Sequence, residues 1–254
     1  MPQKSEPILN VPAVVAATIG AMVIIHLVRV FVLTSEQDFM VLLEFAFIPE
    51  RYVVAADSFP GGWGANIWTF VTHAFLHGGA LHLGVNMAWL LPFGTAVARR
   101  FGPVRFLVFF AVTSAAGAAA HLFTHWGEAV VMIGASGAVS GLMAAATRFA
   151  FQRGGPIHLW ARADFEAYRV PAAPLIDSLR DGRVMAFVAV WFGLNLLFGI
   201  GTVAMPGVDQ AIAWQAHIGG FLAGLLLFPL FDPVAAAPGI VNGNIKPPSD
   251  PSDH

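Results

Sequence analysis

Residues 134–141 read Gly-Ala-Ser-Gly-Ala-Val-Ser-Gly and open a hydrophobic segment with small side chains and a hydroxyl, that of Ser136, with no evident structural task. Glycine and serine are also common where helices touch inside membranes, so the stretch alone is a weak signal of a nucleophile. Ser136 and Ser140 equally suit small packing residues that hydrogen-bond back to helix carbonyls. The meaning of the stretch therefore depends on the rest of the chain.

The composition identifies the setting. The chain has 254 residues, of which 57% are hydrophobic and 11% charged, and its mean hydropathy is +0.71. These values are far too apolar for an ordinary soluble domain and indicate a polytopic membrane protein. The formal net charge of −2 argues against a nucleic-acid partner. The absence of cysteine excludes disulfides, a thiolate nucleophile and cysteine-based metal or iron–sulfur sites.

Six segments approach the ~20 apolar residues that a helix needs to span a bilayer. They are Val14–Leu33, Ala80–Ala98, Val104–Phe123, Ser136–Phe151, Val184–Ile200 and Ala211–Phe231. We predict an all-α membrane protein, a bundle of six transmembrane helices formed by residues 1–232, followed by a polar, disordered cytoplasmic tail at 233–254. No internal repeat is visible, which disfavours an inverted-repeat transporter.

Basic residues set the predicted orientation, because short cytoplasmic loops are enriched in lysine and arginine. They cluster after the second segment, at Arg99, Arg100 and Arg105, and around the link between the fourth and fifth, at Arg148, Arg153, Arg162, Arg169, Arg180 and Arg183. Both termini are therefore expected in the cytoplasm. The loops Thr34–Gly79, Thr124–Gly134 and Gly201–Gln210 then face outside.

The first external loop is long and amphipathic, and we expect it to lie partly in the membrane interface with Trp63 and Trp68 as anchors. The first apolar segment is long enough to span, so no cleavable signal peptide is expected. Arginine exceeds lysine and alanine is abundant, which favours a GC-rich bacterial source. The expected location is the bacterial inner membrane.

Ser136 and His217 are predicted to meet at one depth near the external side. His217, Gly220 and Gly224 form a stripe on the last segment, and Gly137 and Gly141 form another on the fourth. Such faces let two helix backbones approach closely in lipid. A serine hydroxyl becomes a good nucleophile when a base within ~2.6–3.2 Å takes its proton. No acidic residue falls inside a predicted span, so the pattern predicts a Ser–His dyad.

Donors for a developing oxyanion are available on the second segment. His82 and Asn86 are four residues apart and share a helix face. The amide of Ser136 adds a backbone donor, because it lies in the first turn of its helix. His77 precedes a Gly-Gly break and is placed to reach the same cavity from the loop.

Several motifs resemble the signatures of the rhomboid family of intramembrane serine proteases. The three principal ones are the Gly-Ala-Ser-Gly of Gly134–Gly137, the Ala-His-x-x-Gly-x-x-x-Gly of Ala216–Gly224, and the run Phe75–Asn86, which reads Phe-Leu-His-Gly-Gly-Ala-Leu-His-x-x-x-Asn. Phe47–Arg51, in the first loop, and Arg99–Gly102, after the second segment, add to the likeness. Together, in this order and on these sides of the membrane, the motifs are highly specific.

The resemblance covers roughly Phe47–Phe231 and implies a six-helix bundle with a water-filled cavity open to the outside. It implies an endopeptidase that cleaves transmembrane protein substrates near their external ends, without cofactor or metal. In such enzymes a dyad matching Ser136 and His217 acts. The oxyanion is held by groups matching His82, Asn86 and the Ser136 amide.

Two further expectations follow from the resemblance. Substrate entry would involve displacement of the fifth helix, Val184–Ile200, and of the capping loop Gly201–Gln210. Many members carry an aromatic residue four positions after the nucleophile, against which the catalytic imidazole packs. Ser140 stands there in this chain, and its hydroxyl offers a hydrogen bond that would orient His217 instead.

Other classes of protein are less well supported. A metal or haem site would draw on His73, His77, His82 and His217, but His77 and His82 are five apart across a glycine break and lack a carboxylate partner. A transporter or channel would more naturally carry embedded carboxylates. A catalytically inactive relative that binds or sorts membrane clients would be expected to lack the serine or the histidine. Asn195 is interpreted as a residue that hydrogen-bonds between helices, that is, as interhelical glue.

Overall fold

The computed structural model describes residues 11–156, 165–199 and 213–234. The regular elements of this part are all helices, and the single extended pairing in it is an isolated antiparallel bridge between Phe47 and Met132. The all-α prediction is confirmed for these residues. The predicted capping loop Gly201–Gln210 and the predicted tail beyond residue 234 lie outside them.

Four helices among the described residues are long and apolar enough to cross a membrane. They are α1 (Ala13–Phe31), α4 (Ala80–Phe101), α5 (Pro103–Thr124) and α9 (Trp214–Phe231). The other elements are α2 (Ser35–Phe45), α3 (Gly62–Thr72), α6 (Ser136–Thr147), α7 (Leu175–Arg180) and α8 (Gly182–Gly199), with 3-10 turns η1 (Pro49–Tyr52), η2 (Ala56–Ser58), η3 (His73–Phe75) and η4 (Phe165–Arg169). Each of the six predicted segments overlaps a helix in its described residues, although α6 and α8 are shorter as apolar spans.

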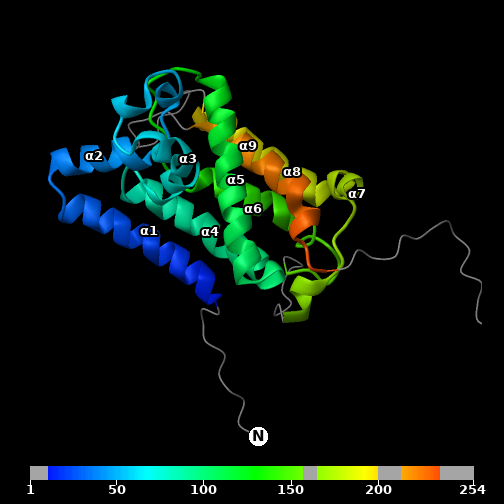
Figure 1. Cartoon of the computed structure of the whole chain (residues 1–254). Coiled ribbons are helices and arrows are strands. Elements are labelled where there is room, and N and C mark those ends of the chain that lie inside the picture. Colours follow the sequence, from blue (N-terminus) through cyan, green and yellow to red (C-terminus); the bar gives the residue numbers. More distant parts are fainter. Residues whose placement is uncertain (1–10, 157–164, 200–212, 235–254) are drawn as a thin grey trace, which may run out of the picture.

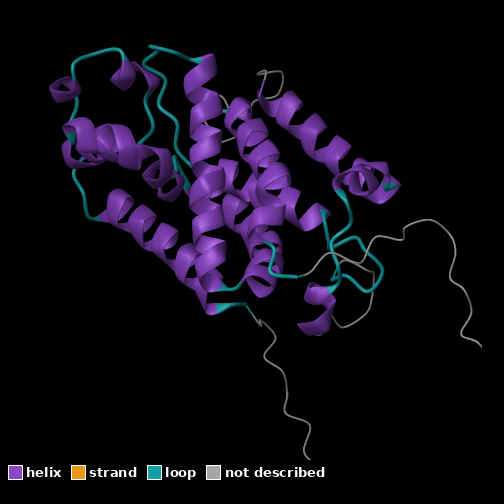
Figure 2. Cartoon of the chain, turned by 45° about the vertical axis from the view of Figure 1, so that its right-hand side comes forward, coloured by secondary structure: helices purple, strands orange, loops and turns teal. Residues whose placement is uncertain are grey.

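Helix α6 runs through the middle of the molecule. It packs against α9, α5 and α4, and every residue from Gly137 to Thr147 is buried (Figures 1 and 2). The helix ends at Thr147 rather than at the predicted Phe151. Its 12 residues span only about 18 Å. Because other helices surround α6, it has no need to match the thickness of the lipid.

Glycines set the close approach of α6 and α9. A Cβ added to Gly220 or Gly224 would collide with the carbonyl oxygen of Gly137 or Gly141, respectively. This confirms the predicted contact between the two small-residue stripes. In lipid the hydrophobic effect does not drive helices together, so van der Waals contacts between the closely packed backbones stabilise the pair instead. The N-terminal ends of α6 and α9 are thereby held side by side.

The segment between α1 and α4 is built from short helices. Thr34 caps α2, accepting from the amide of Gln37, whose side chain accepts in return from the Thr34 amide. Arg51 is almost fully buried and donates to the carbonyls of Leu43 and Pro60. It thus ties α2, η1 and the turn before α3 into one unit.

Helix α1 is attached to this segment through Arg29. Its guanidinium pairs with Asp38 of α2 at 2.6 Å and donates to the carbonyl of His77 at 3.0 Å. These contacts of Arg29 could not be predicted from the sequence, since Asp38 lies nine residues and His77 forty-eight residues further along the chain. The arginine places the loop after η3 beside the end of α1.

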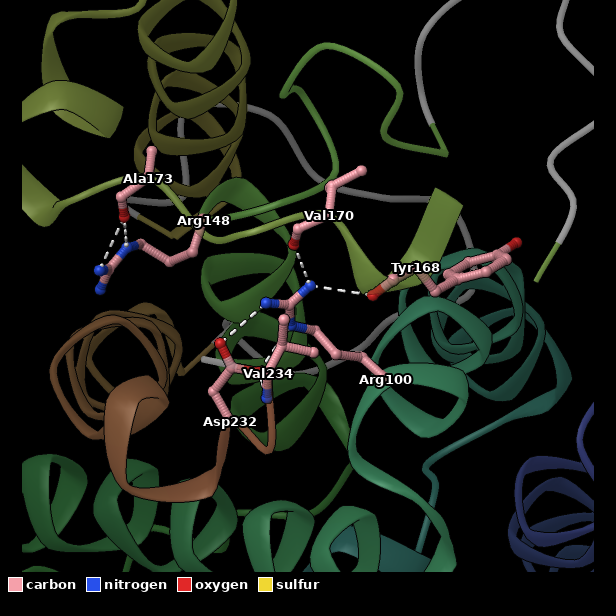
Figure 3. Close-up of polar contacts among 7 residues, drawn as sticks. All are labelled: Arg100, Arg148, Tyr168, Val170, Ala173, Asp232 and Val234. Atoms are coloured by element: carbon pink, nitrogen blue, oxygen red, sulfur yellow. Dashed lines mark hydrogen bonds and ion pairs between the residues drawn. The ribbon is translucent and has the colours of Figure 1, made fainter. Parts of the chain in front are cut away.

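Two buried arginines organise the opposite end of the bundle (Figure 3). Arg100, at the end of α4, pairs with Asp232 through two contacts of 2.8 Å and donates to the carbonyls of Tyr168 and Val170. Arg148, just after α6, donates to the carbonyl of Ala173 at 2.9 Å. The link between α6 and α8 is therefore fixed to α4 and to the end of α9.

Candidate active site

Ser136 and His217 lie together at the N-terminal ends of their helices. Ser136 is the first residue of α6, and His217 lies in the first turn of α9, which begins at Trp214. Ser136 Oγ and His217 Nε2 are 2.6 Å apart. This distance allows the hydroxyl to donate to a neutral imidazole nitrogen. The structure brings the predicted pair into contact.

The other ring nitrogen of His217 has a partner that the sequence did not identify. Its Nδ1 contacts Asn195 Oδ1 of α8, and the Asn195 amide nitrogen donates to the carbonyl of Trp191 at 2.7 Å. Asn195 does join two helices, as expected of interhelical glue, but its partner is the imidazole. The sequence did contain a signal for this role, because Asn195 is the one amide side chain on the largely apolar helix α8.

A cavity of about 600 Å³ opens on this pair. Ser136, His217, Asn195, His82 and Asn86 all line it, so four helices, α4, α6, α8 and α9, contribute side chains to one space. Much of the remaining wall is apolar. Examples are Leu81, Val85, Trp89, Met143 and Trp191. Such a wall suits a ligand whose surface is mainly apolar.

The hydrogen bond made by the His82 ring indicates which of its two nitrogens carries the proton. Its Nδ1 accepts from the amide of Gly78 at a long 3.4 Å, which leaves the proton on Nε2. Gly134 brings its backbone close to this nitrogen: a Cβ added to Gly134 would lie 2.6 Å from His82 Nε2. The imidazole Nε2 therefore lies beside the chain segment that leads into Ser136.

Asn86 uses only part of its amide within the protein. Its Nδ2 donates to the carbonyl of His82 at 2.9 Å. A side-chain amide carries two N–H groups, so one stays available to the cavity. His82 and Asn86 do not contact Ser136 directly; they face the space beside it.

Ser140 does not support His217. Its hydroxyl donates to the carbonyl of Ser136 at 2.7 Å, within the same helix. The expected hydrogen bond from Ser140 to the imidazole is wrong, because the back-bond to the carbonyl four residues earlier satisfies the hydroxyl locally. Asn195 supplies the contact to the imidazole instead.

Two further histidines lie near the site without contacting the dyad. Burial lowers the pKa of His73 to about 4, and its Nδ1 donates to the carbonyl of Thr69 at 2.8 Å. Burial and then the nearby His82 lower the pKa of His77 to about 3. Both are neutral at pH 7. Among the described residues, no three histidine, aspartate or glutamate side chains are grouped to hold a metal ion.

The fold and the site together define a class: a helical integral membrane protein with a serine and a histidine paired at an internal cavity. The family model of the Rhomboid domain matches residues 64–232. The chain belongs to the rhomboid family.

Curated relatives agree with this assignment. RHOMBOID-like protein 4 of Arabidopsis thaliana is 31% identical over 160 residues, which cover 63% of this chain and 33% of the relative. The rhomboid protease GlpG of Yersinia pestis (strain Pestoides F) is 28% identical over 161 residues, which cover 63% of this chain and 47% of that protein. The match thus spans between a third and a half of the relatives' length.

Proposed function

We propose that this protein is an intramembrane serine endopeptidase that hydrolyses peptide bonds in or near transmembrane segments of membrane proteins. The observation that carries the proposal is the 2.6 Å contact between Ser136 Oγ and His217 Nε2 inside a cavity. Family membership supports it, and among the relatives the Yersinia protein is named a protease. No metal or cofactor is needed for this chemistry.

The proposed reaction has two stages. His217 Nε2 takes the proton of Ser136 as its Oγ attacks the substrate carbonyl carbon, and the resulting imidazolium gives that proton to the leaving amine as the C–N bond breaks. Water then attacks the acyl-enzyme ester with His217 again as base. The ester bond to Oγ breaks, and the proton returns to Ser136.

We propose that the oxyanion of each tetrahedral intermediate is held by His82 Nε2–H, the free N–H of Asn86 and the Ser136 amide. The first two face the cavity, and the third belongs to the first turn of α6, whose amides have no partner within the helix. Loss of one such donor costs about 3–4 kcal/mol of transition-state stabilisation. His82→Ala and Asn86→Ala are therefore expected to impair turnover more than binding.

The proposed placement is a six-span bundle in a bacterial inner membrane with both termini in the cytoplasm. The short α6 and the apolar α8 complete the six, and the arginines of the α6–α8 link support a cytoplasmic position for that end. The segment containing α2 and α3 would then lie outside, where the largely exposed side chain of Trp63 suits the interface.

The test is cleavage of a single-span substrate, with small residues near the external end of its helix, by purified protein in liposomes. The parent is compared with Ser136→Ala and His217→Ala, with and without a chelator. We expect cleavage by the parent that resists the chelator and disappears in both variants. Labelling of the parent, but not of Ser136→Ala, by a fluorophosphonate would report the nucleophile independently.

The opposite result would favour the inactive relative that binds membrane clients. If the parent protein binds the substrate but neither cleaves it nor reacts with the fluorophosphonate, the protein is a client-binding relative without protease activity. The topology has its own check: a reporter fused after His254 should read cytoplasmic, and an external signal would reverse the placement.

A further inference from the structure

Asn195 fixes the direction of the hydrogen bonds around His217. Its Nδ2 donates to the carbonyl of Trp191, one turn earlier on α8, at 2.7 Å. The opposite orientation of the amide would set its oxygen against that carbonyl oxygen, two acceptors without a hydrogen between them. Asn195 Oδ1 therefore points at His217 Nδ1, as the structure has it.

An amide oxygen only accepts, so the proton of neutral His217 must be on Nδ1. Nε2 is then unprotonated and carries the lone pair. Ser136 Oγ lies 2.6 Å from this nitrogen and donates to it. The chain of contacts from the Trp191 carbonyl through Asn195 and His217 to Ser136 thus has one consistent set of proton positions, which is the set that general-base catalysis requires.

We propose that Asn195 is a positioning residue that holds His217 in the tautomer and orientation needed to deprotonate Ser136, so that the pair works as a Ser–His–Asn triad. The inference rests on the proposed protease function. The Nδ1–H bond to Oδ1 strengthens when His217 becomes an imidazolium, because a charged donor then meets the same acceptor.

The residue type fits its surroundings. A carboxylate in this place would be a charge on an apolar helix inside a membrane, which is costly. The amide supplies the acceptor without that charge. Helix α9 itself offers no polar side chain beside His217 that the structure bonds to Nδ1, and the Ser140 hydroxyl is taken up by the Ser136 carbonyl. Asn195 is the group that fulfils this role.

The decisive pair of variants is Asn195→Leu and Asn195→Asp. Leucine has nearly the same shape and no acceptor, so we expect kcat to fall by roughly 100-fold, the lower end of what a general base contributes, with KM unchanged. A protonated aspartic acid can donate to Trp191 and accept from Nδ1, so it should recover at least about tenfold of that loss. Leu196→Ala, on the exposed side of α8, is the control and should retain parent kinetics.

A spectroscopic readout separates this proposal from the proposed function. With ¹⁵N-labelled histidine, the signal that disappears in His217→Gln identifies His217, and in the parent it should report a proton on Nδ1 and none on Nε2. Asn195→Leu should show a mixture of the two tautomers. This measurement does not require an active enzyme.

The outcomes are distinct. A parent that fails to cleave or label, yet shows the Nδ1–H tautomer, would remove the protease function and leave the hydrogen-bond arrangement standing. An active parent, with Asn195→Leu cutting at the parental kcat, would overturn the positioning role. So would an Asn195→Leu loss that is accompanied by a lowered melting temperature and that Asn195→Asp does not rescue, because the role would then be structural.

Discussion

Gly134 has a backbone that few other residues adopt. Its φ is +115°, in the region that favours glycine, and it lies two residues before the proposed nucleophile. The position also lacks space, because an added Cβ would lie 2.6 Å from His82 Nε2. The first glycine of the 134–141 stretch therefore shapes the wall of the site beside His82.

We expect Gly134→Ala to lower the cleavage rate by at least about tenfold, because His82 must move away from the oxyanion position. The transition state would then lose up to the stabilisation that one hydrogen-bond donor provides. The strained φ should also reduce the free energy of unfolding by roughly 1–3 kcal/mol. Cleavage rates and melting temperatures would be measured side by side. Gly84→Ala, where a Cβ meets open space, is the matched control. Equal activity of the two variants would contradict this account of Gly134.

His73 predicts a dependence of stability on pH. It is neutral in the fold, with a pKa near 4 caused by burial, against about 6.5 for an unperturbed histidine. Its contribution is complete above pH 6.5 and is lost as the pH falls from 6.5 toward 4, because the unfolded chain binds the proton first. The slope is about 1.4 kcal/mol per pH unit for each such histidine.

The comparison is thermal unfolding in detergent, from pH 7.5 to 4.5, for the parent and His73→Asn. The variant should lose stability less steeply below pH 6.5, although His77 still contributes to its slope in the same direction. Above pH 7 the two curves should run parallel. Parallel curves over the whole range would show that His73 binds its proton equally in the folded and unfolded chains.

At the scale of helices, the contact of α6 with α9 determines whether a dyad exists. Gly220 faces the carbonyl of Gly137, and Gly224 faces that of Gly141, with no room for a methyl group. We expect Gly220→Val to separate the two helices, cost about 1–3 kcal/mol of stability and abolish cleavage. Gly20→Ala, in α1 and in open space, should leave cleavage intact and stabilise α1 slightly.

Fluorophosphonate labelling adds a second measurement for Gly220→Val. The variant should also label poorly, since Ser136 would lose the 2.6 Å contact that activates it. Normal labelling and cleavage in a folded Gly220→Val protein would mean that the helix contact can be relaxed without disturbing the site.

The sequence was most informative where spacing along one helix determines geometry. The stripes of Gly137 with Gly141 and of Gly220 with Gly224 follow from the helical period, so the meeting of α6 and α9 could be predicted. Asn195 could not be assigned its contact in this way, because the rotation of α8 relative to α9 depends on packing. The partner of Ser140 was mispredicted for a related reason: a local carbonyl competes with any distant acceptor.

Across the whole molecule, Arg100 connects parts far apart in the chain. Its side chain is fully buried, paired with Asp232, and it holds two carbonyls of the α6–α8 link (Figure 3). We expect Arg100→Ala to reduce the free energy of unfolding by about 3–5 kcal/mol, because Asp232 would be left buried without its partner. Arg105→Ala, on an exposed surface, should change it little.

A double variant tests the origin of that loss. Adding Asp232→Asn to Arg100→Ala removes the unpaired charge and should restore part of the stability, measured as a melting temperature in the same detergent. Full additivity of the two changes would indicate that Arg100 acts through the carbonyls of Tyr168 and Val170 rather than through Asp232.

The ion pair between Arg29 and Asp38 bears on where this protein can be shortened. The matched region begins at residue 64, so α1 and α2 both precede it. Yet Arg29 donates to the carbonyl of His77, next to the Gly78 amide that bonds His82, and Val15 and Met22 of α1 are completely buried in the main core. A version trimmed to the matched residues would lack this support and expose that core. The stretch by which family membership is recognised is therefore shorter than the stretch that has to fold together.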